Sequence, residues 1–250
     1  MKKTTPTQEP SIQIINWVEL VIFYVIALVV SAPFRLRLVN MEDILPLPFG
    51  FNIFYHVLRG IGPLAGFIVV YYLLKSRVER KISFWGRNRF FSLLAILVIP
   101  VGLTMAGVQN DFGLSRNYYG MLTGLMLILY ALAEEYGWRA YLQEALAPLP
   151  IVWRILIIAV LWYLWHLNFI IPPFNIKMQL IHFLALFLGA WGLLKISEST
   201  YSVLFVAAVH LSFNLMSDVA CGFRARLIIL SFSVLLWIVL IKLLTRKNIV

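Results

Sequence analysis

Two adjacent carboxylates lie in an otherwise apolar part of the chain, within the run AEEYGWR at residues 133–139. Charged side chains in such a segment are costly and usually face a partner or a cavity. Glu135 and Arg139 are four residues apart, so on a helix they share a face and are predicted to form an ion pair. Glu134 points about 100° away from Glu135, and no residue one turn away can neutralise it. The run therefore predicts one paired carboxylate and one unpaired carboxylate that is available for chemistry.

Two later segments carry further polar side chains at helical spacing. Trp162 and His166 are one turn apart in the first segment, and His210 and Asn214 are one turn apart in the second. If the three segments are neighbouring helices, they present a carboxylate, a histidine, and a histidine with an amide. Cavities between the helices of a bundle are where such sites are built.

These residue types suit hydrolysis. A carboxylate in an apolar cavity holds a proton more readily than it does in water, which suits a general base near neutral pH. Glu134 and His166 could therefore polarise a water molecule. His210 and Asn214 could donate hydrogen bonds to the oxygen of a tetrahedral intermediate, and such a donor is typically worth roughly 3–4 kcal/mol. No serine or cysteine nucleophile is needed.

A zinc site is the chemical alternative. Glu134, His166 and His210 would make a set of two histidines and one carboxylate, as in hydrolytic zinc sites. The chain lacks a His-Glu-x-x-His helix, however, and Asn214 is a poor zinc ligand. We therefore expect no metal and no other cofactor.

The amino-acid composition indicates what kind of secondary structure carries these residues. Hydrophobic residues make up 62% of the chain and charged residues 13%, with a mean hydropathy of +0.88. Soluble domains are about half apolar and about a quarter charged, so a soluble fold is excluded. We predict an all-α, polytopic transmembrane helical bundle in a single integral membrane domain, residues 1–250, whose motifs fall within about 115–220. Apolar runs long enough to span a bilayer predict about eight membrane helices, at roughly 14–32, 53–74, 91–108, 118–140, 153–172, 178–195, 202–219 and 226–244.

The distribution of basic residues predicts the orientation. The net charge is +10, and the basic residues lie in short blocks between apolar runs. The side that holds both termini and the block at 75–89 carries the larger share of Lys and Arg, which is typical of the cytoplasmic face. We therefore expect a multi-pass protein of the cell membrane with both termini in the cytoplasm. No tract alternates basic and aromatic residues, so a nucleic-acid partner is not expected.

Other polar residues have simpler interpretations. His56 and Arg59 are expected near a helix end, with the Arg59 side chain reaching toward the membrane surface. His182 is expected to be a hydrogen-bonded packing residue. Asp218 lies one turn after Asn214 and could orient a residue of the site.

The three motifs, in this order on successive apolar segments, resemble the CPBP family. That family includes CAAX prenyl endopeptidases and bacteriocin-processing or immunity proteins, also called the Abi family. The resemblance implies that Glu134 and His166 activate the water, that His210 and Asn214 form the oxyanion site, and that no metal is used. It also makes Glu135 and Arg139 residues of the first motif. The second motif of the family usually has Phe four residues before His, whereas this chain has Trp162, so we expect a reshaped pocket wall.

The predicted helices place the two water-activating residues at different depths. At about 1.5 Å per residue, Glu134 lies about 24 Å from the start of its helix, and His166 about 20 Å from the opposite face. Across a core of about 30 Å their depths would differ by about 14 Å. Helix tilt or a buried helix start would close this gap. Pro172 and Pro173 favour a late end to the helix of His166, which would also help.

Together these features predict an intramembrane, metal-independent endopeptidase that cleaves a membrane-proximal peptide bond. Its partners would be the lipid bilayer and a membrane protein or peptide substrate, which could be lipidated. A non-enzymatic immunity or scaffold protein with the same fold, and a zinc-dependent membrane protease, are the alternatives. A transporter would predict repeated halves with matched broken helices, and the sequence has no such repeat.

Overall fold

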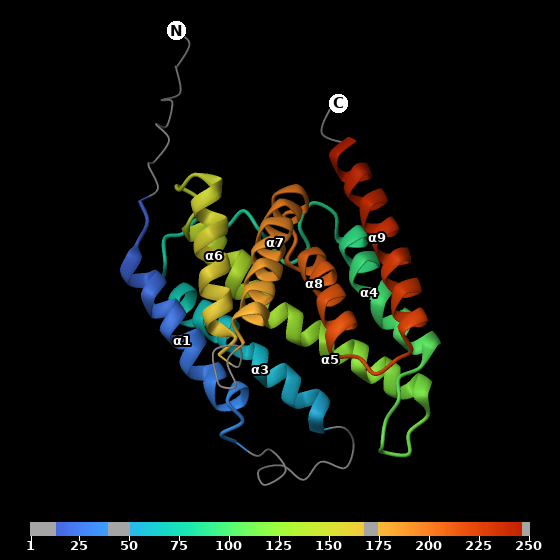
Figure 1. The fold of residues 1–250 in the computed structure, drawn as a ribbon. Coiled ribbons are helices and arrows are strands. Elements are labelled where there is room, and N and C mark those ends of the chain that lie inside the picture. Colours follow the sequence, from blue (N-terminus) through green and yellow to red (C-terminus); the bar gives the residue numbers. More distant parts are fainter. Residues whose placement is uncertain (1–13, 40–50, 168–174, 247–250) are drawn as a thin grey trace.

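The computed structural model describes residues 14–39, 51–167 and 175–246, which form a bundle of helices (Figure 1). The α-helices are α1 (Trp17–Arg35), α3 (Phe51–Ile68), α4 (Arg89–Ala106), α5 (Arg116–Gly137), α6 (Ile151–Trp165), α7 (Ile176–Thr200), α8 (Val203–Ser217) and α9 (Phe223–Arg246). Two π-helical segments extend them: η1 (Val69–Leu73) follows α3, and η2 (Trp138–Gln143) follows α5. Each of the eight predicted segments corresponds to one α-helix of the described residues.

Several of these helices are suited to a bilayer. Five helices are long and apolar enough to cross a membrane, namely α1, α3 with η1, α4, α7 and α9. α6 and α8 are apolar but shorter. The prediction of an all-α, multi-pass membrane bundle is therefore confirmed. The start of α1 and the end of α9 lie on the same side of the bundle in Figure 1. That the termini are cytoplasmic stays a prediction.

Asparagine and serine residues mark where many helices begin. A side chain at the N-cap accepts a hydrogen bond from a backbone N–H of the first turn, which otherwise has no partner within the helix. This cap is present at α1, α4, α5, α7 and α8, on Asn16, Asn88, Ser115, Asn175 and Ser202.

Small residues let α5 approach its neighbours closely. A Cβ atom on Gly137 would lie 2.4 Å from the Cβ of Pro63 in α3, and one on Gly124 would lie 2.7 Å from the Cα of Pro100 in α4. Both distances are too short for a real side chain, so glycine is required where these helices meet. Close packing through small residues is typical of membrane helices, which cannot rely on the hydrophobic effect to associate.

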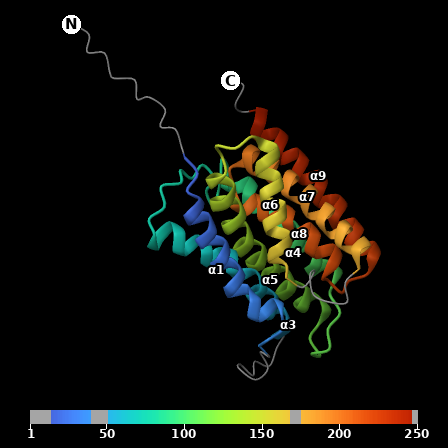
Figure 2. The same ribbon diagram turned by 60° about the vertical axis from the view of Figure 1, so that its left-hand side comes forward.

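α5, which carries Glu134, is tilted relative to α6. α3 and α5 run obliquely across the bundle, whereas α6, α7, α8 and α9 are steeper (Figure 1). The turned view in Figure 2 shows α5 and α6 between α1 and α9. Glu134, near the end of α5, lies beside α6, where Trp162 Nε1 donates a hydrogen bond to it.

The expected late end of the His166 helix is wrong. α6 ends at Trp165, His166 is its C-cap, and Leu167 follows with a positive φ of 47°. A left-handed residue cannot continue an α-helix, so the chain leaves the helix there. Pro172 and Pro173, on which the expectation rested, lie outside the described residues.

Candidate active site

The two carboxylates lie at the junction between α5 and the π-helical segment η2. Glu134 and Glu135 occupy the last turn of α5, and both are fully buried. η2 begins at Trp138 and contains Arg139. A π-helical turn changes the direction in which the following side chains point, and such turns are frequent at functional sites. The sequence pattern did not predict this segment.

Glu135 has two partners on opposite sides. Its Oε2 accepts a hydrogen bond from Arg139 Nε at 2.8 Å, which confirms the predicted ion pair. Its Oε1 lies 2.6 Å from His210 Nδ1 on α8. A carboxylate oxygen accepts, so Nδ1 of His210 is the donor in this contact. Glu135 therefore ties η2 and α8 together, a link that sequence spacing alone could not show.

Glu134 is not left unpaired, contrary to the sequence expectation. Its Oε2 accepts from Trp162 Nε1 at 3.0 Å, and its Oε1 lies 3.5 Å from Arg35 Nη2. The expectation failed because it considered only partners one turn away on the same helix. Arg35 is the last residue of α1, nearly one hundred residues before Glu134 in the chain.

Arg35 is held from several directions. Its guanidinium lies over the ring of Trp165, 3.4 Å from the ring centroid. Its Nε donates to the backbone oxygen of Arg59 at 3.1 Å, and its Nη2 donates to the hydroxyl of Tyr130 at 3.3 Å. The residue is 4% exposed. Four elements, α1, α3, α5 and α6, therefore meet around this one cation.

His166 is oriented by its own helix. Its Nδ1 lies 2.7 Å from the backbone oxygen of Trp162. A carbonyl oxygen can only accept, so Nδ1 carries the proton and Nε2 is the acceptor nitrogen of the neutral ring. Trp162 thus contacts both water-activating candidates, His166 through its carbonyl and Glu134 through its indole N–H.

His210 and Asn214 lie one turn apart on α8, as predicted from their spacing. Asn214 is 7% exposed, and its Nδ2 donates to Asp218 Oδ2 at 3.2 Å. This contact gives Asp218 the orienting position expected from the sequence. The second N–H of the Asn214 amide is not used by that bond.

These side chains surround one cavity of about 310 Å³. Of the predicted site residues, Trp162, His166, His210 and Asn214 line its wall. Arg35, His56, Arg59, Tyr130, His182 and Asp218 also line it. Glu134 lies directly behind this wall, since its partners Arg35 and Trp162 form part of the lining. The structure therefore brings the three motifs together, and it adds His56, Arg59 and His182, for which we had expected only packing or helix-end positions.

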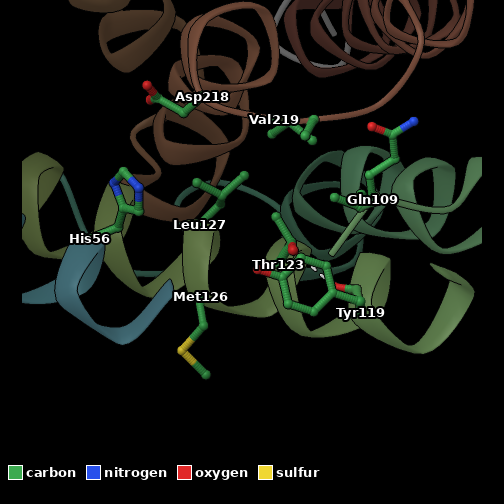
Figure 3. Close-up of a pocket in the computed structure, with 10 residues that line it drawn as sticks. His56, Gln109, Tyr119, Thr123, Met126, Leu127, Asp218 and Val219 are labelled. Carbon is green, nitrogen blue, oxygen red and sulfur yellow. Dashed lines mark hydrogen bonds between the residues drawn. The ribbon is translucent and has the colours of Figure 1, made fainter. Parts of the chain in front are cut away.

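A second pocket of about 190 Å³ adjoins the cavity, and the two share His56 and Asp218. Figure 3 shows these two residues at one end of the pocket and Gln109 and Tyr119 at the other. Apolar side chains such as Leu127 line much of the remainder. The two spaces together could receive an extended segment of chain.

The described residues contain no group of three or more His, Cys, Asp or Glu that could hold a metal ion. The zinc alternative required Glu134, His166 and His210 as a set. In the structure His210 instead contacts Glu135, and Glu134 contacts Arg35 and Trp162.

Comparison with protein families gives one match. Residues 116–216 match the family described as Type II CAAX prenyl endopeptidase Rce1-like. The match covers α5 to α8 almost completely and includes all seven residues of the three motifs. The resemblance seen in the sequence is thereby confirmed. Comparisons with curated proteins and with solved structures gave no match.

Proposed function

We propose that this chain, whose residues 116–216 match the Rce1-like family of type II CAAX prenyl endopeptidases, cleaves a membrane-proximal peptide bond with a water activated by Glu134 and His166. The observation that supports this mechanism most directly is the double contact of Trp162. Its indole N–H holds the carboxylate of Glu134, and its carbonyl oxygen holds the ring of His166. Both candidates are thus fixed beside the same cavity.

The water is deprotonated as it attacks. Its oxygen forms a bond to the carbonyl carbon of the substrate, and its proton passes to Glu134. The Nε2 atom of neutral His166 accepts a second hydrogen bond from the water and so fixes its direction. The proton on Glu134 then passes to the leaving nitrogen as the C–N bond breaks. The carboxylate is restored, and the atoms and charges balance.

The oxyanion is stabilised from α8. The N–H of Asn214 that does not bind Asp218 donates to the developing oxygen anion. His210 already donates its Nδ1–H to Glu135, so its ring can donate a second hydrogen bond only through a protonated Nε2. The negative charge of Glu135 favours that protonated ring. Donors fixed before the reaction begins are the usual source of large transition-state stabilisation.

The substrate is a membrane protein or peptide that reaches the cavity from the bilayer or its surface. Many large apolar side chains on the outer helix faces are exposed, for example Ile228 at 70% and Leu188 at 61%. This surface is suited to lipid, and a substrate with an apolar or lipidated segment would share that environment. A cavity among α5, α6 and α8 then admits the peptide bond close to the membrane.

The test compares membranes from cells that carry the unchanged protein, Glu134→Gln, or Glu198→Gln. Glu198 serves as the control because it is a partly exposed glutamate that pairs with Arg154 and Lys195 on the surface. Uncut precursors should accumulate only with Glu134→Gln, provided that this variant inserts and folds normally. A purified Glu134→Gln protein that cleaves a confirmed substrate at the original rate would refute the mechanism. If no precursor ever distinguishes the two variants, a non-enzymatic role becomes the better explanation.

A further inference from the structure

The buried cation of α1 lies against the carboxylate that the proposed mechanism uses as its base. Arg35 Nη2 is 3.5 Å from Glu134 Oε1, and the side chains of both residues are almost completely buried. The segment that matches the family begins at residue 116, so α1 lies outside it. We infer that Arg35 is a positioning residue of the active site that supplies the counter-charge of Glu134 and holds its carboxylate in place. The inference rests on the proposed function.

The two oxygens of Glu134 have different neighbours. Trp162 Nε1 donates a hydrogen bond to Oε2, whereas Oε1 accepts no hydrogen bond from the described residues and has the charge of Arg35 Nη2 3.5 Å away. The indole N–H is a neutral donor and can hold either form of a carboxyl group. The guanidinium is charged, so it forms an ion pair with the carboxylate, and an opposite charge within about 4–6 Å has a large effect in a buried site.

The surroundings of Arg35 fix its position independently of Glu134. The ring of Trp165, the backbone oxygen of Arg59 and the hydroxyl of Tyr130 each contact the guanidinium. A flexible arginine would be free to leave the carboxylate, whereas this one is held against it. Its charge is therefore already in position when a substrate arrives, which is the condition for efficient electrostatic assistance.

Other charged or titratable groups near Glu134 do not replace this contact. His210 on α8 donates to Glu135, and His166 on α6 donates to the carbonyl oxygen of Trp162. Arg139 on η2 pairs with Glu135. The remaining titratable groups around this part of the cavity are Tyr130 on α5, His56 and Arg59 on α3, His182 on α7 and Asp218 on α8. Among the described residues, Arg35 makes the ion pair with Glu134 that the structure records.

Replacing Arg35 should shift the pH dependence of kcat/KM. A general base works only when it is deprotonated, so kcat/KM rises with pH as Glu134 loses its proton. Arg35→Gln removes the opposite charge that lies 3.5 Å from this base. The acidic limb of the pH profile should therefore move upward by about one to three pH units in Arg35→Gln. Activity lost at neutral pH should return, at least in part, at alkaline pH.

The experiment measures kcat/KM against pH for purified protein in detergent, with a fluorogenic peptide derived from a confirmed substrate. The variants are Arg35→Gln, Arg35→Lys and the control Arg37→Gln, whose residue is exposed just beyond the end of α1. Arg35→Lys keeps the positive charge but loses the planar guanidinium group. The acidic limb of its pH profile should therefore stay near the original pH while its kcat falls. Arg37→Gln should match the unchanged protein.

Two outcomes would overturn the inference. In the first, Arg35→Gln loses activity equally at every pH, as a purely structural residue would. In the second, Arg35→Lys shifts the limb as far as Arg35→Gln does. If Arg35→Gln does not fold, Arg35→Lys still tests the inference. An acidic limb of its pH profile that is displaced by one pH unit or more would contradict a role of the positive charge.

Infrared spectra provide a reading independent of activity: a protonated carboxyl band should appear at neutral pH in Arg35→Gln and vanish when Glu134→Gln is added. Failure of Glu134→Gln to abolish cleavage would instead refute the proposed function itself.

Discussion

Glu135 Oε1 lies 2.6 Å from Nδ1 of His210, and this contact joins the end of α5 to α8 beside the cavity. The other oxygen of Glu135 is bound to Arg139. The Glu135 carboxylate therefore contacts both Arg139, in the adjoining segment η2, and His210, a candidate oxyanion donor. Under the proposed mechanism the two adjacent acidic residues have different roles: Glu135 organises the site, and Glu134, behind the cavity wall, is the base.

Glu135→Gln should destabilise the protein more than it affects the chemical step. The neutral amide leaves Arg139, which is fully buried, without a counter-charge. Breaking a buried ion pair by removing one partner typically costs about 3–5 kcal/mol. Thermal unfolding in detergent, compared with that of the surface variant Glu198→Gln, measures the effect. A Glu135→Gln protein with unchanged thermal stability and no activity would contradict the role given to this residue.

Trp162→Phe should lower activity without abolishing it. Phenylalanine keeps an aromatic wall but lacks the N–H that donates to Glu134. A hydrogen bond to a charged group contributes about 1.5–3 kcal/mol, so kcat/KM should fall by roughly 10- to 100-fold. The contact to His166 uses the backbone carbonyl and remains. Trp153→Phe, at an exposed position near the start of α6, is the control. A loss as complete as that of Glu134→Gln would mean that Trp162 does more than hold the carboxylate.

The sequence predicted the helices well because their signal is local. Each membrane segment is an apolar run whose length is set by the bilayer, so composition alone locates it, except for the end of α6, which comes earlier than predicted. The ion pair of Glu135 with Arg139 was predictable for the same reason, since both residues lie on one stretch of helix. The spacing of His210 and Asn214 likewise placed them on one face of α8.

The contacts that complete the site are long-range, and local periodicity cannot show them. Arg35 is nearly one hundred residues from Glu134 in the chain, and only the packing of α1 against the bundle brings it there. The close contacts of Gly124 and Gly137 with neighbouring helices were unpredictable for a related reason, because their partners Pro100 and Pro63 lie on other helices. The early end of α6 depends on the left-handed conformation of Leu167, which a leucine side chain does not favour.

Chelation should leave activity unchanged. The proposed water activation uses a carboxylate and a neutral imidazole and assigns no step to a metal. Purified protein treated with a strong zinc chelator and passed through a desalting column should keep its original kcat/KM. A known zinc protease treated in parallel confirms that the chelator works. Activity that disappears on chelation and returns with added zinc would favour the zinc alternative.

Glu134 and His166 should behave as one functional unit. Glu134→Gln keeps the shape of the side chain but cannot take a proton from water, and loss of a general base typically costs about 10²–10⁴ in rate. His166→Ala should cost a similar factor, because the water loses its second hydrogen-bond partner. The double variant of Glu134 and His166 should be little less active than either single variant, since a water that has lost one of the two groups is already ineffective.

Asn214→Ala provides the contrast. It removes an oxyanion donor, should cost about 10²–10³ alone, and should add to the loss from His166→Ala because it acts on a different atom of the transition state. Single-turnover rates of the three single variants and of the two double variants, with thermal unfolding as the check on folding, test this pattern. Full additivity between Glu134→Gln and His166→Ala would show that the two side chains act on separate steps, and the shared activation of one water would then be wrong.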